Sequence, residues 1–488
     1  MTGQHHVIMR RPAHRFYHFP HIVRISLTHS ADFFSLIVAI LPRLWYSGSM
    51  ELPIAFCERM KESLGEEYPA FLAFYDLPEV KGIRLNPRYG LTQERAEALL
   101  GVRLDPIPYE DTGYWVTGEL TGNHPLHHAG AFYMQEPSAM LPANALDIPQ
   151  DATVLDLCAA PGGKSTRLSQ LVPDGLLVSN EIDLGRCRTL VGNLERLGAP
   201  NTVVTNLDPS GVERLFGGAF DVVLVDAPCS GEGMFRKNPQ AKEEWSLSNV
   251  AMCAARQKDI LSHAIGTVKV GGYLVYSTCT FAPDENEGAV AWLTEHGFEL
   301  VEPTQRVMEA TVPSPVYPLA RRAYPHLTRG EGHFVAVLRK VEGESAPRKL
   351  SPWQKPDPKE DKLARAFVES AFDRSIDYKW WNGYAVLPPK GDAIPPKGLN
   401  VGVKLGKVEG GRFVPHHALW RCMWKDCKIF LDLPLDDPRV AKYLRGETIQ
   451  ADVPNGWGVL TVEGCPLGGF KAVDGTLKNH YPKGLRLT

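Results

Sequence analysis

Two cysteines and one aspartate are the residues of this 488-residue chain best suited to covalent chemistry. Asp226 and Cys229 follow an apolar run in the segment DAPCSGEG, and Cys279 follows another in YSTCT. If these runs are adjacent parallel strands, both cysteines lie at the sheet edge where α/β proteins bind ligands. A single cysteine is usually a small buried hydrophobic residue. Two cysteines beside a carboxylate indicate a thiolate nucleophile instead.

A turn of small residues is the strongest candidate for a cofactor site. The segment DLCAAPGGKS, from Asp156 to Ser165, joins an apolar run to a predicted helix. Its glycines allow a cofactor to approach the backbone at the carboxyl end of the first strand. It matches neither the G-x-G-x-x-G dinucleotide fingerprint nor the G-x-x-x-x-G-K-[ST] phosphate loop. Glycine turns after strands are structural as often as functional, so the turn alone leaves both interpretations open.

Carboxylates follow the next two apolar runs. Glu181 and Asp183 come after the second run and Asp208 after the third. A carboxylate at the second strand end is placed to accept both hydroxyls of a ribose. Helix capping is the alternative, and it suits Asp183 well and Asp208 fairly, because Asp is a common N-cap residue. Glu caps poorly, so Glu181 is predicted to be a ligand-binding residue.

The elements that position these residues alternate between short apolar strands and helices from about residue 131 to residue 341. Such alternation predicts an α/β domain with a parallel sheet covered by helices. Before it, residues 50–130 contain two helices, a short strand stopped by Pro87 and a further helix, which predicts a small α/β module. The strands predicted for the larger domain are 154–157, 176–179, 203–206, 222–225 and 273–276.

The C-terminal third begins with a predicted linker over 342–362, which is rich in Pro, Ser and mixed charge. Beyond it, residues 363–488 predict one helix over 363–372 and a compact, mostly-β module punctuated by glycine. Its predicted strands are 384–387, 401–405 and 458–462. Residues 1–49 lack helical or strand periodicity and are predicted to be an unstructured extension outside the functional protein, with a targeting segment as the alternative.

Composition favours a soluble protein with several domains. Hydrophobic content of 44% and charged content of 22% are ordinary for globular proteins. The nine cysteines are spread over the chain without the spacing of a disulfide scaffold, which favours a reducing, cytoplasmic location. A formal net charge of −3 gives no support to a polyanionic partner, except through local basic patches such as 471–488. Cys422 and Cys427 beside His416 and His417 fit no common zinc module, so no metal is expected.

Four ordered motifs carry a resemblance to a known family. DLCAAPGGKS, NEID, DAPCSGEG and YSTCT resemble the NOL1/NOP2/Sun family of RNA cytosine-5 methyltransferases, over about 130–340. The flanking segment FYMQEPSAM resembles the family's entry segment, and GEGMFRK and HYPKGLR are similar to its bacterial RsmF-type branch, which acts on small-subunit (16S) ribosomal RNA. The resemblance implies a class I S-adenosylmethionine-dependent fold with a seven-stranded, mostly parallel sheet. It also implies a PUA-like RNA-binding region over 363–488.

The same resemblance implies roles for the candidate residues. Cys279 is expected to attack carbon 6 of cytosine, Asp226 to orient the base and stabilise the adduct, and Cys229 to assist product release. Glu181 is expected to bind the ribose and Asp208 to lie near the adenine, with Arg186 as a further contact or a solvated charge. The expected cofactor turn comprises Cys158, Ala159, Ala160, Pro161, Gly162, Gly163 and Lys164, together with Asp226.

RNA contacts are the least constrained of these expectations, because exposed basic residues are usually only solvated. The partner is expected to be ribosomal RNA or the 30S subunit, bound by a monomer. Alternatives are the same chemistry on transfer RNA or large-subunit RNA, a non-catalytic assembly factor, and exchanged roles of the two cysteines. The expected contacts are Arg84, Asn86, Arg236, Lys237, Lys483 and Arg486, with Arg321, Arg322, Lys471 and Lys478 as further candidates.

Overall fold

The computed structural model describes residues 52–343, 351–389, 393–394 and 398–487. The chain divides after Ser49 into two units. The first unit, and with it the prediction made for residues 1–49, lies outside the described residues. No helix in the described part of the chain is long and apolar enough to cross a membrane.

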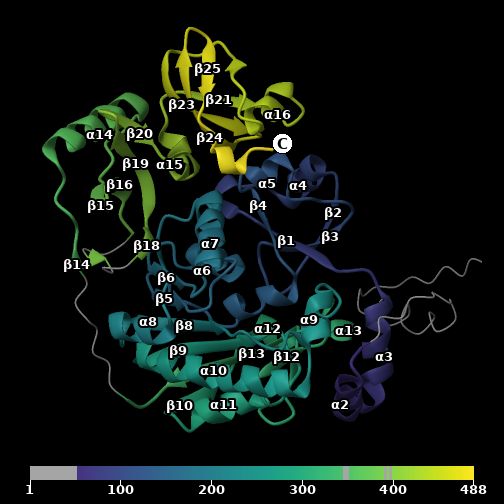
Figure 1. Cartoon of the computed structure of the whole chain (residues 1–488). Coiled ribbons are helices and arrows are strands. Elements are labelled where there is room, and N and C mark those ends of the chain that lie inside the picture. The colour runs from purple at the N-terminus through teal and green to yellow at the C-terminus, as the bar shows by residue number, and fades with distance from the viewer. Residues whose placement is uncertain (1–51, 344–350, 390–392, 395–397, 488) are drawn as a thin grey trace, which may run out of the picture. The chain divides into compact units, whose positions relative to one another are not determined.

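A ten-stranded sheet is the centre of the second unit (Figure 1). Five parallel strands lie in the order β9-β8-β5-β6-β7, with antiparallel β13 beside β9 and β10 paired to β13. These seven strands confirm the predicted seven-stranded, mostly parallel sheet. They are β5 (Thr153–Asp156), β6 (Leu176–Asn180), β7 (Thr202–Thr205), β8 (Phe220–Asp226), β9 (Val268–Thr278), β10 (Phe298–Val301) and β13 (His333–Lys340). The edge beyond β13 is extended by β12 (Arg321–Ala323) and β11 (Val312–Pro313).

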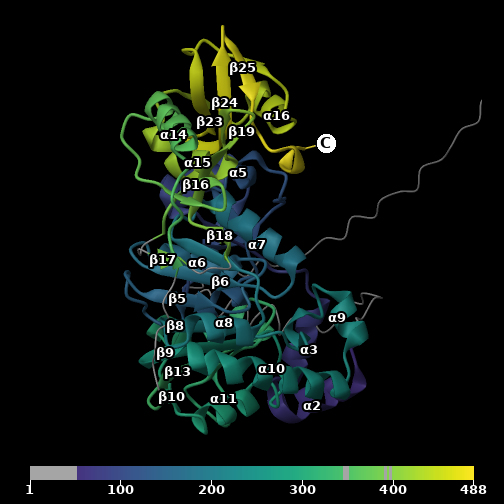
Figure 2. The same ribbon diagram turned by 60° about the vertical axis from the view of Figure 1, so that its left-hand side comes forward.

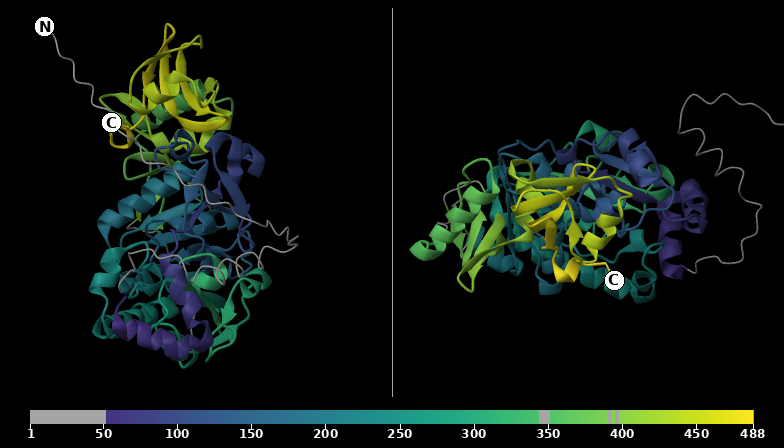
Figure 3. Two further views of the ribbon diagram at one scale, coloured as in Figure 1. Left: turned by 90° about the vertical axis from the view of Figure 1, so that its right-hand side faces the viewer. Right: turned by 90° about the horizontal axis from the view of Figure 1, so that it is seen from above.

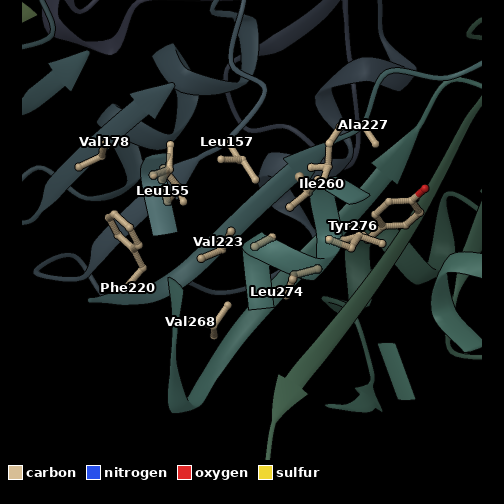
Figure 4. Packing of buried hydrophobic residues seen from close by; sticks show 14 of the residues in the cluster. Leu155, Leu157, Val178, Phe220, Val223, Ala227, Ile260, Val268, Leu274 and Tyr276 are labelled. Carbon is tan, nitrogen blue, oxygen red and sulfur yellow. The ribbon is translucent and has the colours of Figure 1, made fainter. Parts of the chain in front are cut away.

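Alternate residues of the central strands contribute to cores on opposite faces of this sheet. Leu155 and Val223 belong to the core that Ile260 of α10 (Leu247–Thr267) joins (Figure 4). Val154 and Val222 belong to a second core. Parallel strands buried on both faces have this continuous apolar character, and each fully buried aliphatic side chain stabilises the fold by about 1.5–3 kcal/mol. The other helices of this domain are α6 (Gly163–Leu171), α7 (Leu184–Leu197), α8 (Pro209–Phe216), α9 (Pro239–Glu244), α11 (Glu287–Thr294), α12 (Gln305–Glu309) and α13 (Pro325–Thr328).

The N-terminal module is a four-stranded antiparallel sheet in the order β2-β3-β1-β4. Its strands are β1 (Lys81–Leu85), β2 (Arg103–Pro106), β3 (Gly113–Thr117) and β4 (Phe132–Met134), joined by α4 (Gln93–Leu100) and α5 (Pro125–His128). The predicted boundary after residue 130 is too early, because β4 pairs with β1.

Two helices that precede this sheet pack elsewhere. Phe56 of α2 (Ile54–Leu64) and Phe71 of α3 (Tyr68–Ala73) share an aromatic cluster with Phe235 and Phe281 of the domain that contains the ten-stranded sheet. The left view of Figure 3 shows these two helices, in purple, against the teal helices of that domain. The predicted module over 50–130 is therefore divided between two cores.

The C-terminal region contains two sheets where the sequence predicted one module (Figure 2). The first consists of β15 (Lys379–Trp381), β16 (Tyr384–Leu387), β19 (Val403–Glu409) and β20 (Arg412–Pro415), with α14 (Pro358–Ala371) and α15 (His417–Met423). The second consists of β21 (Phe430–Leu433), β22 (Ile449–Gln450), β23 (Gly456–Val462), β24 (Cys465–Val473) and β25 (Thr476–Asn479), with α16 (Pro438–Leu444). A short antiparallel pair joins β14 (Ser351–Pro352), which precedes the first sheet, to β17 (Ala393–Ile394), which lies between β16 and β19 in the chain.

The strand predicted over 401–405 is wrong, because Gly402 divides it. β18 (Gly398–Val401) pairs antiparallel with β7 at the edge of the ten-stranded sheet, and β19 turns away into the C-terminal sheet. Gly402 has φ +57°, and a Cβ there would lie 1.9 Å from the carbonyl oxygen of Leu387. Only glycine fits this position.

The predicted linker also ends earlier than residue 362, because α14 begins at Pro358. Asp357 caps this helix by accepting the backbone N–H groups of Lys359 and Glu360. Proline is well suited to the first helical position that follows such a cap.

Candidate active site

The two candidate cysteines lie beside each other. Cys229 follows β8 and Cys279 follows β9, and these parallel neighbours pair Asp226 with Ser277. The Sγ atoms of Cys229 and Cys279 are 3.3 Å apart, and neither thiol is in a disulfide. The neighbouring Cys279 and burial raise the pKa of Cys229 well above its ordinary value. Cys229 is therefore a neutral thiol at physiological pH, able to donate its S–H to the sulfur of Cys279.

A buried hydrogen-bond network fixes the loops that carry these thiols. Glu285 accepts hydrogen bonds from the backbone N–H and the hydroxyl of Ser230 and from the side-chain amide of Gln257. The Oγ atom of Ser230 also lies 2.8 Å from Oγ1 of Thr280. Ser230 follows Cys229 and Thr280 follows Cys279, so the network joins the two loops directly behind their reactive atoms.

A second buried carboxylate joins the same loops to the N-terminal helix α2. Oε1 of Glu232 accepts from the indole of Trp245 at 2.8 Å and pairs with Arg59 at 2.5 Å. Its Oε2 accepts the backbone N–H of Phe281 at 3.0 Å. Next to it, Gly233 approaches so closely that a Cβ would lie 3.0 Å from the carbonyl oxygen of Cys279.

Asp226 is an ionised carboxylate with three partners. Its Oδ2 pairs with Nζ of Lys164 at 2.7 Å, and its Oδ1 accepts from the hydroxyl of Ser277 at 2.8 Å. His333, on β13, lies 3.6 Å from the same Oδ1. Burial alone would raise the pKa of Asp226, but Lys164 and His333 hold it well below its usual range. The carboxylate is therefore a permanent hydrogen-bond acceptor beside the thiols.

The predicted cofactor turn is held from outside by side chains that donate to its carbonyl oxygens. Arg186 donates to Ala160 at 2.8 Å, Asn193 to Pro161 at 2.8 Å and Arg84 to Gly163 at 2.7 Å. The side chain of Arg186 is 61% exposed, as a solvated charge would be, and it also pairs with Glu181. Its direct contact with a cofactor remains a prediction.

A cavity of about 200 Å³ opens between this turn and the segment that follows β4. The residues from Cys158 to Pro161, with Gly163 and Lys164, form one wall together with Asp156 and Asp226. Tyr133 and Gln135 also line the cavity. Asp156 is buried, and its Oδ1 has no hydrogen-bond partner. A cavity with small-residue walls and a free buried carboxylate oxygen suits a cationic ligand such as the amino-acid end of S-adenosylmethionine.

The acidic residues that follow β6 and β7 have different roles in the structure. Glu181 is buried and accepts the backbone N–H of Asp183, so it shapes the turn before α7. Asp183 caps α7 and the exposed Asp208 caps α8, which confirms the capping alternative for both. Neither Glu181 nor Asp208 lines the cavity, and their ribose and adenine contacts remain predictions.

Several predicted RNA contacts are wrong, because the side chains are buried and paired inside the protein. Arg84 is 2% exposed and donates to Gln135, Gly163 and Thr166. Asn86 is 1% exposed and donates to the carbonyl oxygens of Gly130 and Leu197. The other buried members of the predicted set are Arg236, which pairs with Glu331, Arg322, which pairs with Glu287, and Arg321, which donates to Met308 and Thr311.

The remaining basic candidates are accessible. Lys471, Lys478 and Lys483 are exposed on the C-terminal sheet and the segment after it, and Lys237 is partly exposed. Arg486 is partly buried and donates to the carbonyl oxygen of Tyr481. Among the residues that the structure describes, no group of three or more His, Cys, Asp or Glu side chains is arranged to hold a metal.

Sequence reasoning missed the residues that support the site from a distance. Glu232 lies within DAPCSGEG but had no predicted role, and Glu285 and Arg59 lie outside the four motifs. Only the tertiary structure brings Glu285 and Arg59 to the cysteine loops. His333 had a visible signal, since it stands in GEGHF at the start of an apolar strand. A histidine at that position is placed at the same sheet edge as Asp226.

Comparisons with known proteins agree with this arrangement. Family models match residues 52–137 as the N-terminal domain of 16S rRNA methyltransferase RsmF, 143–339 as 16S rRNA methyltransferase RsmB/F and 430–487 as the RsmF PUA domain. The second C-terminal sheet is thus the PUA part, and residues 340–429 lie outside these matches.

Individual relatives extend the similarity over most of the chain. Ribosomal RNA small subunit methyltransferase F from Vibrio campbellii is 32% identical over 473 residues, covering 89% of this chain and 97% of the relative. A methyltransferase homologue from Pyrococcus horikoshii has 28% identity and a TM-score of 0.52, over 64% of this chain and 100% of its own. NSun6 from Pyrococcus horikoshii, solved with SFG, shares the fold with a TM-score of 0.55 at 24% identity, over 60% of this chain and 99% of its own. The chain therefore belongs to the RsmF-type NOP2/Sun family of RNA methyltransferases.

Proposed function

We propose that this chain methylates carbon 5 of a cytosine in small-subunit (16S) ribosomal RNA, with S-adenosylmethionine as methyl donor and Cys279 as nucleophile. The observation that carries the proposal is the pair of Sγ atoms 3.3 Å apart, beside an ionised Asp226, at the ends of β8 and β9. Family membership supports the reaction and the substrate class.

The thiols supply what the chemistry of cytosine lacks. Carbon 5 is a poor nucleophile until a thiolate adds to carbon 6, which makes carbon 5 enamine-like and lets it accept the electrophilic methyl group that S-adenosylmethionine supplies. Cys279 forms this bond to carbon 6 as a thiolate. Cys279 and burial raise the pKa of Cys229, which suits a thiol that stays protonated. The resemblance to the NOL1/NOP2/Sun family is what assigns the nucleophile to Cys279 and not to Cys229.

Asp226 and Cys229 act on the two ends of the adduct. When the thiolate adds to carbon 6, the edge of the base ring takes up a proton from solvent. The ionised Asp226 accepts a hydrogen bond from this protonated edge. After methylation, water takes the proton on carbon 5, and the electron pair left behind forms the double bond to carbon 6 as the bond between carbon 6 and sulfur breaks. The ring then returns the proton at its edge to solvent. The S–H of Cys229 stabilises the departing thiolate of Cys279 by a hydrogen bond, which is how it assists release.

The other domains hold the RNA. We assign residues 143–339 to catalysis and the N-terminal and C-terminal sheets to RNA binding, with Lys237, Lys471, Lys478 and Lys483 as phosphate contacts. If the target lies in a helix, the base must be flipped out, which costs a few kcal/mol. We expect the protein to act as a monomer on RNA in the cytoplasm.

The test is a methyl-transfer assay with tritiated S-adenosylmethionine on 30S subunits, naked 16S RNA and bulk transfer RNA. Wild-type protein should label small-subunit RNA, Cys279→Ala should lose activity, and Cys229→Ala should accumulate a covalent protein–RNA adduct. Cys253→Ala, a buried cysteine of α10, is the matched control and should stay active. Label confined to transfer RNA would overturn the substrate, and full activity of Cys279→Ala would overturn the mechanism.

A further inference from the structure

Two consecutive residues of the loop before α11, Glu285 and Asn286, hold the cysteine loops from behind. Both side chains are buried, although the exposed Asp284 precedes them in the same loop. The backbone carbonyl oxygen of Glu285 accepts from the hydroxyl of Tyr276 at 2.7 Å, which anchors this loop to β9. The loop therefore has a fixed position relative to the strand that leads to Cys279.

Glu285 fixes the two neighbours of Cys229 in the chain. Its carboxylate accepts the backbone N–H of Ser230 at 3.0 Å and the side-chain amide of Gln257, on α10, at 2.8 Å. The same amide group of Gln257 donates to the carbonyl oxygen of Pro228 at 3.0 Å. Pro228 and Ser230 flank Cys229, so one pair of side chains holds the backbone on both sides of this thiol.

Asn286 fixes the two neighbours of Cys279 in a similar way. Its Oδ1 accepts from the hydroxyl of Thr278 at 2.6 Å, and its Nδ2 donates to the carbonyl oxygen of Thr280 at 2.9 Å. Asn286 is also the N-cap residue of α11, where an asparagine side chain usually accepts from the helix backbone. Its side chain forms no such cap, because both of its polar atoms bond to the residues beside Cys279.

The two cysteine loops also meet directly. Oγ of Ser230 lies 2.8 Å from Oγ1 of Thr280, and it donates its own proton to Glu285. The hydroxyl of Thr280 is therefore the donor between the loops. Because Glu285 and Asn286 bond to different loops, loss of either side chain should displace one thiol while the other loop keeps its own bonds.

We propose that Glu285 is a positioning residue for Cys229 and that Asn286 is a positioning residue for Cys279, so that each acts on a different step of the reaction. This inference rests on the proposed function, from which it takes the division of labour between the two cysteines. Loss of the Glu285 bonds should slow the release of the methylated base. Loss of the Asn286 bonds should slow the attack of Cys279 on carbon 6, because a displacement of reacting groups by about 1 Å can lower a rate by about 100-fold.

Isosteric variants separate the two steps in a single-turnover assay with tritiated S-adenosylmethionine and the RNA that the wild type labels. Denaturing gels measure the covalent protein–RNA adduct, and the label in the RNA measures methyl transfer. Glu285→Gln turns one acceptor oxygen into a donor that faces the donors of Ser230 and Gln257. It should accumulate adduct as Cys229→Ala does, with first-turnover methyl transfer within about threefold of wild type and later turnovers slowed by about tenfold or more.

Asn286→Asp keeps the acceptor for Thr278 and places a carboxylate oxygen against the carbonyl oxygen of Thr280. It should transfer methyl in the first turnover about tenfold or more slowly, without accumulation of adduct. Both variants should bind S-adenosylhomocysteine as the wild type does, which a general loss of structure would not allow. Asp284→Asn makes the same carboxyl-to-amide change as Glu285→Gln at the exposed neighbouring position, and it should behave as wild type.

Milder variants keep the test open if the buried substitutions prevent folding. Ser230→Ala and Thr278→Val each remove one hydroxyl that donates to Glu285 or to Asn286. They should slow the same two steps, release and attack respectively, by about threefold. Slowing of one common step by both variants of a pair, or release from Glu285→Gln at the wild-type rate, would overturn this inference. Absence of an adduct in Cys229→Ala would instead contradict the proposed function, from which the assignment of the steps is taken.

Discussion

At the scale of single residues, the surroundings shift the pKa values of two aspartates of the site in opposite directions. Lys164 and His333 lower the pKa of Asp226 against the effect of burial, so its contribution to stability is present near neutrality and lost only in strong acid. Burial raises the pKa of Asp156 to about 7. The native state therefore holds a proton on Asp156 that the unfolded chain has already released above about pH 4. Ionisation of Asp156 thus opposes folding as the pH rises.

This difference predicts a stability profile that one substitution changes. Between pH 4 and pH 7, the free energy of unfolding of the wild type should fall relative to that of Asp156→Asn by about 1.4 kcal/mol per pH unit. Urea denaturation of both proteins across this range measures the difference. Asp151→Asn, which alters an exposed carboxyl group, should follow the wild type. Parallel profiles for wild type and Asp156→Asn would show that Asp156 titrates normally.

The sequence predicted which residues lie at the ends of the strands. It did not predict the hydrogen-bond and ion-pair partners of the arginines. The spacing of Cys229 and Cys279 after two apolar runs was enough to predict their proximity, because neighbouring parallel strands end at one edge. Arg84 and Arg236 were misassigned to RNA because an arginine in sequence carries no sign of burial. Their internal partners, Gly163 and Glu331, lie 79 and 95 positions away in the chain.

At the scale of elements, helix α2 supports the cysteine loops from outside the catalytic domain. Its Arg59 is the charged partner of the buried Glu232, whose other bonds reach Trp245 and the backbone of Phe281, two residues after Cys279. Loss of the arginine leaves a buried carboxylate without its counter-charge. The position of Cys279 should then become less well defined.

Arg59→Met should therefore lower kcat more than it raises KM for RNA, and destabilise the protein by about 2 kcal/mol. The rate at which iodoacetamide alkylates Cys279, measured by mass spectrometry of the peptide, should change in parallel. Arg365→Met removes a comparable but exposed ion pair with Asp361 and is the control, with an expected cost below about 1 kcal/mol. Unchanged kcat and alkylation in Arg59→Met would mean that α2 only covers the domain.

Element boundaries show where local sequence is sufficient and where it is not. The carboxyl ends of the strands at the site were predicted to within two residues, because polar or small residues stop each apolar run. The start of β9 at Val268, five residues before the predicted 273, was missed. The division at Gly402 was missed, because the close carbonyl oxygen of Leu387 belongs to another strand. The pairing of β18 with β7 depends on a chain reversal that no local pattern encodes.

At the scale of the whole second unit, the N-terminal and C-terminal sheets share one hydrophobic core. Ile83 and Phe132 of the first sheet belong to the same cluster as Leu460, Phe470 and other residues of the PUA sheet. The partly buried ring of His128 bonds to the hydroxyl of Tyr481 at 3.0 Å across this junction. Arg421 of α15 donates to the carbonyl oxygens of His128 and Pro466, so a third element joins both. The closing HYPKGLR segment is therefore a structural junction as well as a candidate RNA contact.

Because the two sheets share a core, a destabilising substitution in the PUA sheet should also affect the cofactor turn. Phe470→Ala, at a fully buried position, should destabilise the protein by about 3–5 kcal/mol. Amide hydrogen exchange should show loss of protection in β1 and β4 together with β23 and β24. Since Arg84 on β1 donates to Gly163, affinity for S-adenosylhomocysteine should also fall.

Phe430→Ala provides the matched control for this coupling, because its ring is 66% exposed on β21 of the same sheet. Its effect on stability should stay within about 0.5 kcal/mol, with exchange and cofactor binding unchanged. If Phe470→Ala released the PUA sheet while β1 and β4 kept their protection, the two sheets would be independent folding units. The cofactor turn would then depend on the N-terminal module alone, and the PUA sheet would act only through its contacts with RNA.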